Sequence, residues 1–138
     1  MELTDIRAAW LNDALIEEDV PETALPRALQ GKGLHLVVRE LSADEAGDII
    51  DTCTDKSGHL NQKKFMAMVV VNSLRNGDDP ACPLIWDMTF MQPLLSKSLK
   101  PILQIATQSI QLSGLNDQLT TELKNDSGAT VVEGSLSV

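Results

Sequence analysis

The sequence predicts one mainly helical α+β domain, with about five or six helices, one short strand pair or hairpin and a flexible C-terminal tail. Three observations support this prediction. Leucine and valine alternate with other residues over 34–38, as in a half-buried strand. A Ser-x-x-Glu helix-capping pattern follows at 42–45. The run 65–71 is apolar on every side, as in a helix at the centre of a core. The domain should span 1–126 and the tail 127–138.

The N-terminal segment has the pattern of an amphipathic helix. Leu3, Ile6 and Trp10 recur at helical spacing, which predicts a helix over about residues 4–15. Such a stripe has to pack against something, and large aromatic side chains are highly buried on average. We therefore favour packing of Trp10 in the core, with a contact as the alternative. The acidic run 17–22 then follows as a connector, in which proline prevents further helix.

The next element is the strand at about 34–40, which leads directly into a helix. In the capping box, the Ser42 hydroxyl accepts from the Glu45 amide while the Glu45 carboxylate accepts from the Ser42 amide. The helix should end near Cys53, because the threonine, aspartate, serine and glycine that follow favour local side-chain hydrogen bonds.

The central apolar helix should begin at an Asn61 cap and continue through Leu74, until Asn76 and Gly77 stop it. The segment 82–86 should be extended and form the second strand of the pair. Pro83 lacks a donor for a strand ladder, which confines this segment to an edge or a loop.

Two further helices complete the predicted domain. Asp87 can cap one that runs to about residue 96, and Ser98 can cap another that ends at Gly114. A short helix should restart at Asn116.

Charge and composition exclude several classes of protein. The net charge is −9, and the 11 basic residues are scattered except for Lys63 and Lys64, so we expect no nucleic-acid binding. The two cysteines stand in unrelated contexts, which favours a reducing compartment. We expect a cytoplasmic protein without membrane association, because Glu2 is unlike a signal peptide and no apolar run reaches about 18 residues.

The sequence offers little for catalysis or for a cofactor. Residues 55–58 resemble part of a calcium loop, but aligning Gly58 with the loop glycine places Lys64 where the bidentate glutamate belongs. Histidines and cysteines lack the paired spacing of zinc ligands. No nucleophile motif or phosphate-binding loop is present in the sequence. We therefore expect no catalytic residue, metal or cofactor, and no enzyme activity.

Four residues are candidates for contacts with a partner or with a second copy of the chain: Leu3, Ile6, Trp10 and Trp86. Trp86 follows the proline-bearing segment, where it is either buried or an exposed interface anchor. Four methionines, at 66, 68, 88 and 91, either fill gaps in the core or form an adaptable surface.

The order of these elements resembles the tail assembly chaperones of long-tailed, siphovirus-type bacteriophages and prophages. The resemblance covers roughly residues 3–125 and is carried by four segments: Val37–Ala43, Val71–Asp78, Pro83–Trp86 and Leu112–Leu115. It implies a non-catalytic assembly factor of the host cytoplasm, absent from the mature virion. Repeated weak contacts along an extended partner favour avidity, so we also expect a homo-oligomer. Its implied partners are the tape measure protein, which it coats, and the tail tube protein, whose subunits it helps recruit.

Two alternatives remain at this stage. An acidic regulator that mimics nucleic acid and occupies a basic partner needs a dense acidic ridge, whereas the acids here are divided among three segments. A small-molecule-binding helical domain needs a pocket with converging polar groups.

Overall fold

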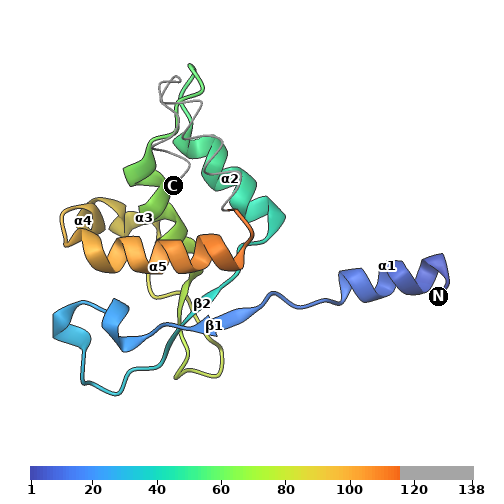
Figure 1. The fold of residues 1–138 in the computed structure, drawn as a ribbon, viewed down its shortest axis with the longest axis horizontal. Helices are drawn as coiled ribbons and strands as arrows, with labels where there is room; N and C mark the ends of the chain where they lie inside the picture. The colour runs from blue at the N-terminus through green and yellow to red at the C-terminus, as the bar shows by residue number, and fades with distance from the viewer. Residues whose placement is uncertain (116–138) are drawn as a thin grey trace, which may run out of the picture.

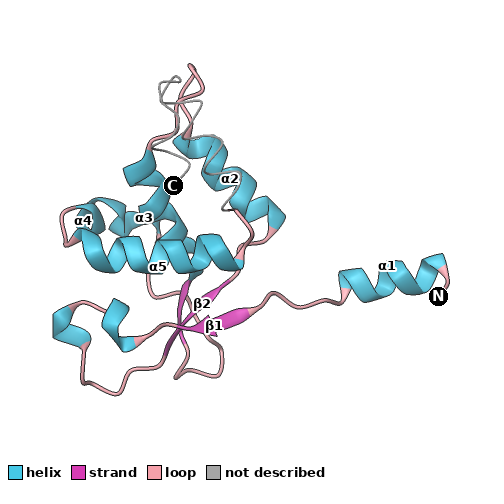
Figure 2. Cartoon of the chain, in the orientation of Figure 1, coloured by secondary structure: helices cyan, strands magenta, loops and turns pink. Residues whose placement is uncertain are grey.

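The computed structural model describes residues 1–115, which form five α-helices, three short 3-10 helices and one three-stranded antiparallel sheet. The predicted mixed fold of helices and a small sheet is confirmed. Four helices gather on one side of the sheet, while the first stands apart (Figure 2). The expected helix at Asn116, the domain limit at 126 and the tail 127–138 lie outside the described residues.

The first helix, α1 (Leu3–Leu11), projects away from the rest of the molecule (Figure 1). It is shorter than the predicted 4–15, and every residue from 1 to 19 is exposed. The expectation that Trp10 lies in the core is wrong, since 80% of its surface is accessible. Helical periodicity shows which residues share a face of a helix, but it does not show what packs on that face. Within residues 1–115, nothing covers the apolar face of α1.

The sheet has the order β1 (Glu17–Asp19), β2 (Leu36–Arg39), β3 (Leu74–Asn76), and both pairings are antiparallel. The acidic run expected as a connector is thus partly a strand. Its three acidic side chains are tolerated because β1 is an edge strand with an exposed surface. Two 3-10 helices, η1 (Glu22–Ala24) and η2 (Arg27–Leu29), lead from β1 towards β2.

The predicted pairing of 34–40 with 82–86 is wrong. β2 lies between β1 and β3, and the segment around Leu84 bridges the far side of β3. The Asn76 N–H donates to Pro83 O at 2.9 Å and the Ile85 N–H donates to Leu74 O at 3.1 Å. As predicted, Pro83 lies at an edge, where the absence of its N–H does not cost the sheet a hydrogen bond.

Helix α2 (Ala43–Cys53) begins and ends as predicted. Its capping box is confirmed, because the Ser42 hydroxyl accepts from the Glu45 N–H at 3.1 Å and the Ser42 N–H donates to Glu45 Oε1 at 2.9 Å. This local pattern fixes where the chain turns from β2 into the helical layer.

Helix α3 (Gln62–Ser73) is the core element that its all-round apolar sequence predicts. Asn61 caps it by accepting from the Lys64 N–H at 3.1 Å. It packs against α2, α4 and α5. Its predicted extension through Leu74 is wrong, because Leu74 adopts extended backbone and pairs with Val38 as the first residue of β3.

The last described elements are η3 (Met88–Phe90), α4 (Met91–Leu95) and α5 (Leu99–Leu112). Asp87 caps η3, accepting from the Thr89 N–H at 2.9 Å. α5 crosses α3 and contacts β2 (Figure 1). Gly114 ends α5 with a φ of 73°, a left-handed conformation that lets the Leu115 N–H reach Ile110 O at 3.0 Å.

Candidate functional site

The most distinctive surface of the described chain is its N-terminal arm, defined here as residues 1–15. None of these residues is buried, although the arm carries several large apolar side chains. Contiguous exposed apolar surface of this kind marks interaction sites in soluble proteins. The exposed apolar residues of the arm are Met1, Leu3, Ile6, Trp10, Leu11 and Leu15.

The arm is attached to the sheet at Ile16, just before β1. The Ile16 N–H donates to Glu40 Oε1 at 2.9 Å, and the Glu40 N–H donates to Ile16 O at 2.8 Å. β1 itself pairs with β2 from Glu17 onward. The arm therefore leaves the body of the protein from a fixed point.

Trp86, the fourth predicted contact residue, is not part of this arm. It is half-buried, packs against the core, and its ring lies 5.2 Å from that of Phe90 at an interplanar angle of 57°. A tilted aromatic pair at this separation is favourable. The structure thus brings Leu3, Ile6 and Trp10 together on the arm and places Trp86 in the body.

Sequence reasoning missed a groove between the start of α3 and α4. It encloses about 580 Å³. Met88 and Met91 line it, although Met91, like Met68, is also buried in the core. The lysine pair and the methionines stand out in the sequence, but no rule of spacing brings 61–64 beside 88–96. The groove is lined by Asn61, Lys63, Lys64, Met88, Met91, Gln92, Leu95 and Ser96.

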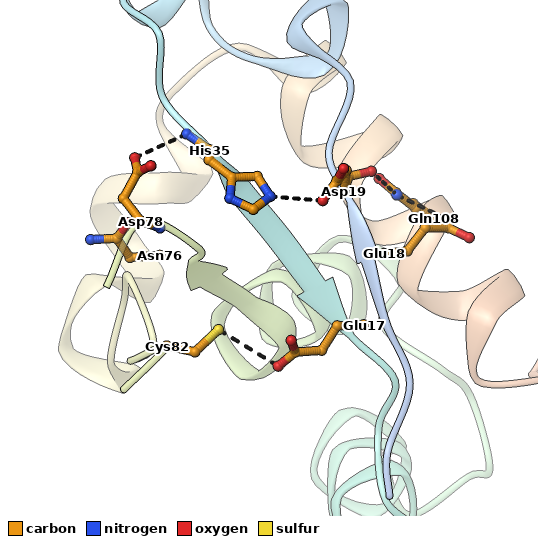
Figure 3. A network of polar contacts seen from close by, with 8 residues as sticks. All are labelled: Glu17, Glu18, Asp19, His35, Asn76, Asp78, Cys82 and Gln108. Carbon is orange, nitrogen blue, oxygen red and sulfur yellow. Dashed lines mark hydrogen bonds and ion pairs between the residues drawn. The ribbon is translucent and has the colours of Figure 1, made fainter. Parts of the chain in front are cut away.

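A polar network lies at one end of the sheet, where β1 ends, β2 begins and β3 ends, and it reaches α5 (Figure 3). His35 Nε2 lies 2.8 Å from Asp19 Oδ1, and the His35 N–H donates to Asp78 Oδ2 at 3.1 Å. Gln108 on α5 donates to Asp19 O at 2.8 Å. The hydrogen bond to Asp19 raises the pKa of His35, and the nearby charges of Asp19 and Asp78 add to this.

Gly77 lets the turn that carries Asp78 lie close against His35. Its N–H donates to His35 O at 2.8 Å, and a Cβ at this position would stand 2.8 Å from the same oxygen. Any larger residue would push the turn that carries Asp78 away from β2.

The two cysteines and the calcium-like turn make contacts within the chain. Cys53 and Cys82 are free, and burial raises the pKa of both thiols. Asp55 Oδ1 instead accepts the backbone N–H groups of Ser57 and His59, at 2.8 and 2.9 Å, which holds the turn closed. Within residues 1–115, no three His, Cys, Asp or Glu side chains are grouped as metal ligands.

Comparisons of the chain with protein-family models, with curated proteins and with solved structures find no match. Among the described helices, none combines the length and the apolar character needed to span a bilayer.

Proposed function

We propose that this protein is a non-catalytic tail assembly chaperone of a siphovirus-type phage or prophage. In this role it binds the tape measure protein in the host cytoplasm, helps recruit tail tube subunits and is absent from the mature virion. The observation that carries the proposal is the arm, an apolar helix without a cover in the described chain. The order of the elements, a strand leading through a capping box into a helical layer, agrees with the resemblance in the sequence.

The arm suits a protein that coats a long partner. A long helical tape measure presents repeated apolar surface, and several weakly bound copies hold it better than one tight pocket. Copies that also associate with one another gain further avidity. An exposed helix on a fixed attachment point supplies such a contact without disturbing the core, because none of residues 1–15 is buried.

The proposal is tested by co-expression with a helical fragment of the tape measure protein encoded beside this chain. The intact protein should co-purify with the fragment, and removal of residues 1–15 should weaken the complex by about tenfold or more. The cut ends before Ile16, because Ile16 and β1 are bonded to the sheet.

A matched control is Leu103→Lys, which changes an exposed leucine on α5 and should leave the complex intact. The chaperone proposal fails if the intact protein does not co-purify with the fragment.

A second candidate is the acidic regulator that mimics nucleic acid. Asp19 from the acidic run and Asp78 from the later turn both contact His35. Two acidic residues that are far apart in the sequence are therefore close together in the fold. However, Glu17 contacts Arg39 at 3.2 Å and Glu18 accepts from Gln108 at 2.8 Å, so these acids are already engaged. A mimic would displace a labelled DNA duplex from a basic host protein, whereas the proposed chaperone leaves that complex unchanged.

A further inference from the structure

The groove between α3 and α4 is chemically unusual for this chain. The chain carries a net charge of −9, yet none of the residues that line the groove is acidic. Its apolar lining consists of Met88, which is exposed, Leu95, which is half-buried, and Met91, which is buried. Lys63 and Lys64 supply positive charge. Methionine side chains adapt their shape to an inserted partner.

The positive charge of the groove is available to an occupant. Lys63 and Lys64 stand in the first turn of α3, where the helix dipole adds partial positive charge. Lys64 Nζ lies 3.4 Å from Thr52 O, and among residues 1–115 Lys63 forms no ion pair. The groove therefore favours an apolar segment that carries acidic residues.

The arm has this composition. It presents a stripe of Leu3, Ile6 and Trp10 at helical spacing, all exposed. Its charged residues are three acidic ones and one arginine, in contrast to the two lysines of the groove. They are Glu2, Asp5, Arg7 and Asp13.

The arm does not lie near its own groove. Figure 1 shows α1 and α4 on opposite sides of the molecule. The arm is fixed where Ile16 pairs with Glu40, and α1 extends from that point away from α4. The occupant that fits is therefore the arm of a second copy.

We infer that the arm of one copy docks into the α3–α4 groove of the next. Two different surfaces meet in this contact, so it builds open chains or closed rings, of which the smallest is a pair of copies that exchange arms. Trp10 is the expected anchor, since buried tryptophans dominate interface energies. The inference rests on the self-association included in the proposed function and names the surfaces that produce it.

Two full-length variants test the contact. The arm variant, Ile6→Lys/Trp10→Lys, keeps its groove, and the groove variant, Lys63→Glu/Met88→Glu, keeps its arm. All four positions are exposed, so both variants should fold, which far-UV circular dichroism and thermal melting check. In sedimentation experiments without any tape measure protein, each variant alone should show a dissociation constant raised by about tenfold or more.

The decisive sample is the mixture of the two variants. The intact arm of the groove variant fits the intact groove of the arm variant, so the mixture should form a one-to-one dimer that does not grow. Leu99→Lys/Leu103→Lys, on exposed α5 positions, is the matched control and should associate like the natural sequence.

Three results would overturn the inferred contact. The first is a natural protein that is monomeric at every concentration. The second is self-association of the groove variant alone, which indicates pairing of arm with arm. The third is a mixture of the two variants that stays monomeric. Failure of the contact is distinguishable from failure of the chaperone role. If the arm and groove variants still self-associate and a tape measure fragment co-purifies with them, only the inferred contact is rejected. If the mixture forms the predicted dimer but no tape measure fragment binds, only the chaperone function is rejected.

Discussion

The hydroxyl of Ser113, at the end of α5, accepts a 2.8 Å hydrogen bond from the backbone N–H of Leu41, 72 residues earlier in the chain. This bond joins the last described helix to the junction between β2 and α2. Leu41 is buried, so its N–H has little access to water as a substitute partner.

Ser113→Ala should therefore lower the free energy of unfolding by about 1–3 kcal/mol, the cost of a buried donor without a partner. Chemical denaturation measures this loss. Ser96→Ala is the control, because the Ser96 hydroxyl is exposed and donates to Pro93 O within its own turn. An equal loss in both variants would show that the Leu41 contact adds nothing.

Ser42→Ala should lower the free energy of unfolding by about 1 kcal/mol, because the Glu45 N–H loses its acceptor and the capping box opens. Ser98→Ala is matched to it, since Ser98 occupies the N-cap position of α5 without a side-chain bond. A denaturation midpoint for Ser42→Ala no lower than that of Ser98→Ala would argue against the cap.

Val69→Asp should prevent folding. Val69 is fully buried in α3, where an unpaired carboxylate costs several kcal/mol, comparable to the stability of a whole domain. Leu103→Asp makes a similar change at an exposed position of α5 and should fold. Circular dichroism and cooperative melting distinguish the two variants. A cooperatively folded Val69→Asp protein would contradict the placement of α3 at the centre of the core.

The His35–Asp19 pair should make stability depend on pH. The raised pKa of His35 means that the folded state binds its proton more tightly than the unfolded state, whose value is about 6.5. The contribution is fully present below pH 6.5 and is lost as the pH rises through the folded-state pKa. NMR titration of the His35 ring should show a lower pKa in Asp19→Asn.

The control for this titration is Asp79→Asn, because the Asp79 carboxylate accepts from the Ala81 N–H and has no bond to His35. If Asp19→Asn and Asp79→Asn shift the His35 titration equally, general charge rather than the 2.8 Å contact sets the pKa.

Features that depend on neighbouring residues could be predicted from the sequence. The capping box at Ser42, the Asn61 cap and the Gly114 stop depend on residues within a few positions of one another, and all three are present. The all-apolar run was equally informative, because a helix with no polar face has to be surrounded by other elements.

Patterns that depend on distant partners were not predictable. Strand β1 consists of three acidic residues and forms only because β2 offers a free edge, with Arg39 opposite Glu17. The end of α3 at Ser73 depends on the pairing of Leu74 with Val38. The groove arises from packing of η3 and α4 on α3, which is tertiary information.

For the candidate site, the residues of the apolar stripe were predictable, but their exposure was not. The stripe of Leu3, Ile6 and Trp10 follows from spacing alone, but the same stripe on a buried helix would look identical in sequence. The 80% exposure of Trp10 shows that, of the two alternatives, this side chain does not pack in the core of the described chain.

The most direct test of the chaperone proposal is the number of copies bound to one tape measure molecule. Multi-angle light scattering of purified complexes measures this number for a shorter and a longer tape measure fragment. We predict several copies on each fragment, more on the longer one, and far fewer for the Ile6→Lys/Trp10→Lys variant, because avidity between neighbouring copies is lost. A single copy on both fragments, or no complex with either, would contradict the proposal.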